Sequence, residues 1–143
     1  TATAVELQKQ LDLCLGISRD MAKAAEAARE GRTLRRLLAD SRQRAQGAEF
    51  SSIAATVAAL DADAAKIVGA NLGSVTRLLG AALGVAESAD RTPPGSAYQI
   101  SQQASRDLTA LLTSWKNLID TRLARLNKEL EQNKLPAIDL ARP

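Results

Sequence analysis

Apolar residues recur at intervals of three and four over most of the chain, the spacing that places side chains on one face of an α-helix. The first stripe begins near Thr3 and continues to about Gln46, with Gly16 and Gly31 inside it. Its members are Leu7, Leu11, Cys14, Ile17, Met21, Ala25, Ala28, Leu34, Leu37, Leu38 and Ala45. We expect one long helix, with a kink or a closely packed neighbour at Gly31 and a C-terminal cap at Gly47.

Two shorter helices are expected next. Ser51 or Ser52 is a suitable N-cap for the first of them, which we expect to end between Gly69 and Gly73. Ser74 can then cap the second. The two apolar stripes consist of Ile53, Val57, Leu60, Ala64 and Ile67, and of Val75, Leu78, Leu79, Ala82, Leu83 and Ala86.

The last predicted helix follows a loop at residues 89–95, where Pro93 and Pro94 prevent a helix from continuing. Ser96 opens this helix, and the pattern ends near Asn133. Its broad apolar face is typical of a helix that touches two others. That face contains Ala104, Leu108, Leu111, Leu112, Trp115, Leu118, Ile119, Leu123, Leu126 and Leu130, with Arg122 on the same stripe.

The pattern as a whole predicts an all-α fold, an antiparallel bundle of about four helices in up-down-up-down order. The first and last helices are the long outer ones, and the two middle helices together match one of them in length. We expect a single helical domain over residues 1–135 and a short extended tail over 136–143. No segment alternates apolar and polar residues as a strand does.

Composition changes this picture mainly by exclusion. The chain has no histidine, which excludes catalysis by Ser-His-Asp or Cys-His and zinc sites that use histidine. Its one cysteine, Cys14, lies among leucines and is expected to be buried rather than reactive. We therefore expect no enzyme activity, no cofactor and no metal. No apolar run is long enough to span a membrane, and the start at Thr1 suggests a processed product or a fragment.

Arginines gather near the end of the first predicted helix. At 100° per residue Arg29, Arg32 and Arg36 lie within about 60° of one another. A solvated helix face is the first interpretation, because the chain carries only a small formal charge of +3 and no aromatic residues lie between the arginines. The alternative is a module that binds anions or nucleic acid through the basic face from Arg29 to Arg44.

Other candidate residues favour structural interpretations. Asp61 and Asp63 are two positions apart, so they point to different faces of a helix and do not form a pair of catalytic carboxylates. Trp115 lies on an aliphatic stripe in a chain with only three aromatic residues, the others being Phe50 and Tyr98. We expect it to be a core residue rather than a platform for a ligand.

The C-terminal third shows a resemblance to a known family. The pattern consists of Trp115, Leu118, Leu123, Leu126, Asn127, Leu130, Leu135 and Pro136, preceded by the Asp90-Arg91-Thr92-Pro93 loop. It resembles the C-terminal helical region of large bacterial sortilin-like proteins, which carry VPS10-type or BNR-repeat β-propellers and are often labelled glycosyl hydrolases. The resemblance covers residues 70–140 best. It implies a terminal accessory domain of an exported parent, whose propeller, with any catalytic residue, is absent here.

Asn127 is a polar residue on the apolar face of the last helix, and its buried amide needs hydrogen-bond partners. The backbone that returns after Pro136 can provide them, which would make Asn127 a structural clip. Trp115, Leu126, Asn127, Leu130 and Pro136 thus form the expected structural core motif.

These observations predict a non-catalytic helical accessory domain, structural or protein-interacting, of a larger secreted multidomain protein. The expected partner is the remainder of the parent protein or another protein. Nucleic acid is the less favoured partner, and the oligomeric state is left open. A secreted or periplasmic location follows only from the family resemblance.

Overall fold

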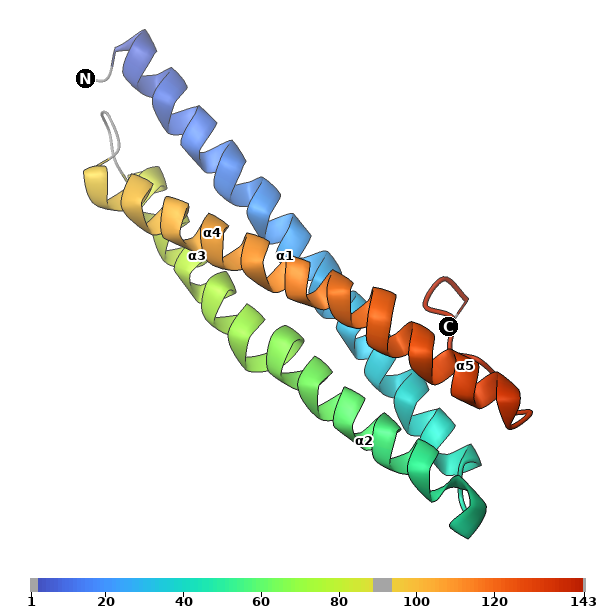
Figure 1. The fold of residues 1–143 in the computed structure, drawn as a ribbon. Helices are drawn as coiled ribbons and strands as arrows, with labels where there is room; N and C mark the ends of the chain where they lie inside the picture. The colour runs from blue at the N-terminus through green and yellow to red at the C-terminus, as the bar shows by residue number, and fades with distance from the viewer. Residues whose placement is uncertain (1–2, 89–93, 143) are drawn as a thin grey trace. The chain divides into compact units, whose positions relative to one another are not determined.

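The computed structural model describes residues 3–88 and 94–142, and every regular element in these ranges is a helix (Figure 1). The prediction of an all-α fold is therefore confirmed. The elements are α1 (Ala4–Arg44), η1 (Ala48–Phe50), α2 (Ser51–Ala65), η2 (Lys66–Asn71), α3 (Leu72–Ser88), α4 (Gly95–Asn117), η3 (Leu118–Leu123) and α5 (Ala124–Gln132).

Both ends of α1 are set by local chemistry. At its start the backbone N–H of Glu6 donates to Thr3 Oγ1 (3.1 Å), and the N–H of Thr3 donates to Glu6 Oε2 (2.8 Å). This reciprocal capping box satisfies two N–H groups that have no partner inside the helix. Gly47, predicted to be the C-terminal cap, lies three residues after the end of α1 and directly before η1, where its φ of 111° favours glycine. The helix is unbroken at Gly31.

The expected break between the two middle helices is not observed. From Ser51 to Ser88 the chain stays helical, because the π-helical segment η2 (Lys66–Asn71) joins α2 to α3. Ser74, predicted to be an N-cap, therefore lies inside a helix. A glycine in a helix costs only about 1 kcal/mol relative to alanine, and no proline is present to stop the chain here.

The last helix is continuous in the same way, since η3 joins α4 to α5. The part of the chain that the structure describes thus contains three long helices, at residues 4–44, 51–88 and 95–132, where the sequence pattern predicted about four. The predicted loop before the last helix falls mostly on residues 89–93, which lie outside the described ranges.

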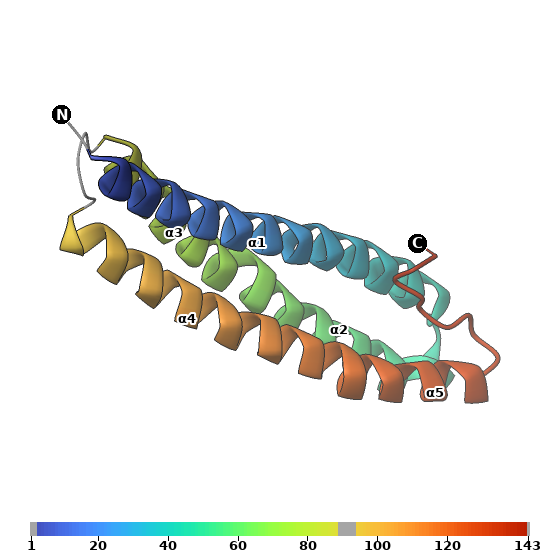
Figure 2. The same ribbon diagram turned by 90° about the horizontal axis from the view of Figure 1, so that it is seen from above.

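The chain divides into two compact units, and α1 and α4 contribute to both. The first unit comprises Thr1–Glu26 and Asn71–Leu111. In it α3 lies beside the first half of α1 (Figure 2), and Gln10 Nε2 donates to the carbonyl oxygen of Ala86 (2.7 Å). Half of the buried apolar residues that the structure describes in this unit are alanines. The buried apolar residues are Ile17, Ala24, Leu72, Val75, Leu79, Ala82, Ala86, Ala97, Ala104 and Leu108.

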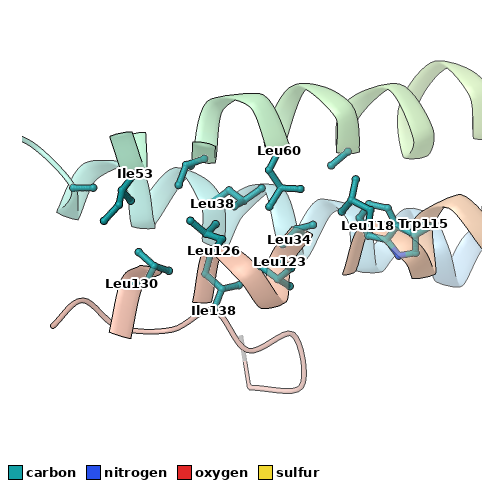
Figure 3. Packing of buried hydrophobic residues seen from close by; sticks show 13 residues of the cluster. Leu34, Leu38, Ile53, Leu60, Trp115, Leu118, Leu123, Leu126, Leu130 and Ile138 are labelled. Atoms are coloured by element: carbon teal, nitrogen blue, oxygen red, sulfur yellow. The ribbon is translucent and has the colours of Figure 1, made fainter. Parts of the chain in front are cut away.

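The second unit comprises Ala27–Ala70 and Leu112–Pro143, and the side chains of its core are mostly large. Leucines from α1, α2, η3 and α5 meet there, and Trp115 lies beside Leu118 at one end of the cluster (Figure 3). The side chains of this cluster are Leu34, Leu38, Ala45, Ile53, Val57, Leu60, Ala64, Trp115, Leu118, Leu123, Leu126, Leu130 and Ile138.

A Schellman motif ends α5 and turns the tail back. The N–H of Leu135 donates to the carbonyl of Leu130 (2.8 Å), and the N–H of Lys134 donates to that of Glu131 (3.1 Å). Lys134 takes the left-handed conformation, with φ of 60°, at the position where glycine is most common. The tail then returns to the core, where Ile138 is buried.

Candidate functional site

A cavity of about 370 Å³ lies between the last turns of α1 and the returning tail, within the second unit. Its basic lining residues are Arg36, Arg44 and Arg142, and its acidic ones are Asp40 and Asp139. The remaining lining residues are Leu37, Ser41, Pro136, Ala137 and Ile138. The charged groups leave a net excess of one positive charge at the cavity.

Asn127 holds the tail that forms one wall of this cavity. Its Nδ2 donates to the carbonyl oxygen of Ile138 (2.9 Å), and its Oδ1 accepts from the N–H of Ile138 (2.8 Å). The contact between Asn127 and the backbone after Pro136 is thus the one that the sequence predicted. A side-chain amide that satisfies both backbone groups of one residue fixes that residue's position and orientation.

The guanidinium groups at the cavity are not neutralised by neighbours. Within the described part of the chain, the side chains of Arg36, Arg44 and Arg142 make no hydrogen bond or ion pair, although two carboxylates line the same cavity. Of the predicted basic surface, Arg36 reaches this cavity, whereas Arg29 and Arg32 are exposed and do not line it. Arg142 was missed because the tail has no helical periodicity that would place it near α1.

The two aspartates in α2 pair with arginines from different helices. Arg35 Nε donates to Asp61 Oδ1 (2.9 Å), and Arg122 of η3 forms an ion pair with Asp63. The hydrogen bond and charge of Arg122 lower the pKa of the Asp63 carboxyl below its ordinary value. The prediction that Asp61 and Asp63 point to different faces is confirmed. Arg122, expected on an apolar stripe, is instead half-exposed in this ion pair.

Trp115 is buried, with 5% of its surface exposed, and belongs to the core cluster of the second unit (Figure 3). Its indole Nε1–H donates to Glu30 Oε1 (2.9 Å) from α1. A buried indole N–H needs such an acceptor. The prediction of a core tryptophan is confirmed, and Glu30 is the partner that the sequence pattern did not reveal.

An exposed apolar stripe on the first half of α1 is the feature that sequence analysis misjudged. Leu7, Leu11 and Leu15 are 52%, 50% and 47% exposed, whereas Ile17 is fully buried. Sequence analysis placed Leu7 and Leu11 on one stripe with Ile17. The spacing of four from Leu7 to Leu11 to Leu15 is the signal that separates them, because it rotates away from the face of Ile17.

Cys14 lies between these two faces and is partly buried. Burial, together with the nearby charge of Glu87, raises the pKa of its thiol, which disfavours the reactive thiolate. Over residues 3–88 and 94–142, no three His, Cys, Asp or Glu side chains are grouped as metal ligands would be. No helix in these ranges has the length and hydropathy that crossing a membrane requires.

Comparisons of the chain with protein-family models, with curated proteins and with solved structures find no match.

Proposed function

We propose that this chain is a non-catalytic helical accessory domain of a larger exported multidomain protein, and that it contacts the remainder of that protein or another protein. The observation that carries the proposal is the exposed leucine stripe, defined as Leu7, Leu11 and Leu15 of α1. The resemblance of residues 70–140 to the helical region of sortilin-like proteins supports the larger, exported parent.

The leucine stripe is informative because its residues differ from isolated surface leucines. Three large aliphatic side chains, each about half-exposed, follow one another at one-turn intervals on the same helix. Contiguous exposed apolar surface of this kind is typical of protein contact sites. The core of the first unit is meanwhile completed by Ile17 and Ala24 on a different face of α1.

The proposal predicts that the leucine stripe is dispensable for folding. In dilute solution, replacing Leu7, Leu11 and Leu15 together by Gln should change the free energy of unfolding by less than about 1 kcal/mol, because surface changes have small effects. The matched control Ile17→Ala, two residues after Leu15 and on the buried face, should cost about 2–5 kcal/mol. Urea denaturation followed by circular dichroism measures both. A triple variant as unstable as Ile17→Ala would make the leucines part of the core and would overturn the proposal.

A second candidate function is anion binding. It is favoured by Arg36, Arg44 and Arg142 at the cavity beside the tail, whose side chains pair with no other described residue. Guanidinium groups bind phosphate in a fork of N–H donors, and a polyanion would also offset the repulsion among them. We would expect saturable binding of pyrophosphate by isothermal titration calorimetry, weakened at least about 10-fold by R36Q/R44Q/R142Q. The control R19Q/R77Q/R106Q makes the same charge change elsewhere and should leave the dissociation constant unchanged. Absence of saturable binding, or equal losses in both variants, would refute this candidate.

A further inference from the structure

The leucine stripe continues into a row of small residues along the same face of α1. At 100° per residue Leu11, Leu15, Ser18, Ala22 and Ala25 fall within an arc of about 80°. All five are exposed, and no charged residue of α1 before Ala25 lies in that arc. Over about four turns, the side chains on this face are therefore large at the N-terminal end and small at the C-terminal end.

This gradient in size fits a second copy of the same helix running in the opposite direction. In an antiparallel pair centred between Gly16 and Ile17, Leu11 lies opposite Ala22 of the partner copy, and Leu15 lies opposite its Ser18. Leu11 and Leu15 each then meet a small side chain, so the two helices can keep a uniform separation over this stretch. A parallel pair would place leucine on leucine at one end and alanine on alanine at the other, which forces the helices to diverge.

The charges beside this face fit the same register. Asp12 and Arg19 lie on one edge of it, about 20° apart around the helix. Because the same edges meet in an antiparallel pair of helices, Asp12 of one copy lies against Arg19 of the other, and the two-fold axis repeats the contact. Asp12 now accepts a hydrogen bond only from its neighbour Gln8 (2.8 Å), and Arg19 has no ion pair within the described residues.

We propose that the first half of α1 is a self-association surface on which a second copy of this chain packs antiparallel, with Asp12 and Arg19 setting the register. This inference rests on the proposed function as a protein-interaction domain and names its partner. The contact closes on itself as a two-fold dimer. One pair of helical faces with few large side chains predicts a dissociation constant of about 1–100 μM.

Charge exchange at Asp12 and Arg19 tests the proposal. Sedimentation velocity from about 1 to 500 μM should show a monomer–dimer equilibrium of the full chain. Asp12→Arg and Arg19→Asp should each weaken dimerisation at least about 10-fold, because each places like charges in contact twice per dimer. The double variant D12R/R19D restores opposite charges and should return to within about threefold of the original dissociation constant. Lys9→Glu, the same charge change as Arg19→Asp on another face, should have no effect.

The possible results separate this inference from the proposed function. A chain that stays monomeric at about 500 μM, or a double variant that is not rescued, overturns the self-association. If the leucine stripe is then still dispensable for folding, the proposed function stands and the partner is a different protein. If the triple leucine variant unfolds, both proposals fall. Circular dichroism of each charge variant checks that folding is unchanged, as the exposed positions of both residues lead us to expect.

Discussion

Replacement of Trp115 by alanine is expected to lower the free energy of unfolding by about 3–5 kcal/mol. The indole is the largest side chain in a core that otherwise consists of aliphatic residues, and it is 95% removed from solvent, with 5% of its surface exposed. Neighbours such as Leu34 and Leu118 cannot expand to fill the space it leaves. Alanine also removes the indole N–H that donates to Glu30, although the carboxylate of Glu30 can still turn toward water. Urea denaturation followed by circular dichroism gives the value.

Trp115→Phe serves as the control that separates packing from the hydrogen bond. Phenylalanine keeps most of the apolar volume and lacks the donor to Glu30, so its effect should be about 1–2 kcal/mol. The fluorescence of the native protein offers an independent check, because the chain has a single tryptophan. Emission typical of water-exposed indole, or a change below about 1 kcal/mol for Trp115→Ala, would contradict burial.

Substitution of Gly31 by alanine is expected to destabilise the protein by about 1–3 kcal/mol, although alanine is the better helix former. A Cβ atom at Gly31 would lie 2.5 Å from Val68 Cγ2 and 2.7 Å from both Cβ and Cγ1 of Val68. Because the contact includes Cβ, no rotamer of Val68 can relieve it, so the backbone of η2 or α1 must move. Thermal or urea denaturation measures the loss.

Gly16 provides a matched control in the same helix. A Cβ atom there meets nothing within 4 Å, so Gly16→Ala should stabilise the protein by up to about 1 kcal/mol. The two glycine substitutions should thus have opposite signs. In a Val68→Ala background two of the three clashing atoms are gone, and the effect of Gly31→Ala should shrink. Stabilisation by Gly31→Ala in the unchanged protein would mean that α1 and η2 are farther apart than the structure has them.

The sequence predicted the environment of residues for which one arrangement is strongly favoured. Trp115 on an aliphatic stripe had to be buried, and the amide of Asn127 had to find partners, which the backbone of Ile138 supplies. In each case a single residue carries a large local penalty that only one arrangement removes.

Other features depend on the balance between weak local preferences and packing, so the sequence alone misjudged them. Gly69 and Gly73 weaken a helix by only about 1 kcal/mol each, and the chain continues through Gly69 as the π-helical segment η2 and through Gly73 as α3. The helix at residues 51–88 therefore joins two segments that the pattern predicted to be separate. The helix at residues 95–132 also contains a π-helical segment, η3.

The candidate sites were decided by tertiary structure alone. Arg142 joins Arg36 and Arg44 because the tail returns to α1, a contact across about 100 residues that no periodicity encodes. Leu7 and Leu11 are as apolar as Ile17, and although their spacing turns them away from its face, the positions of the neighbouring helices decide that they stay exposed. Periodicity determines that a helix has an apolar face, whereas the number and placement of its neighbours determine how much of that face is covered.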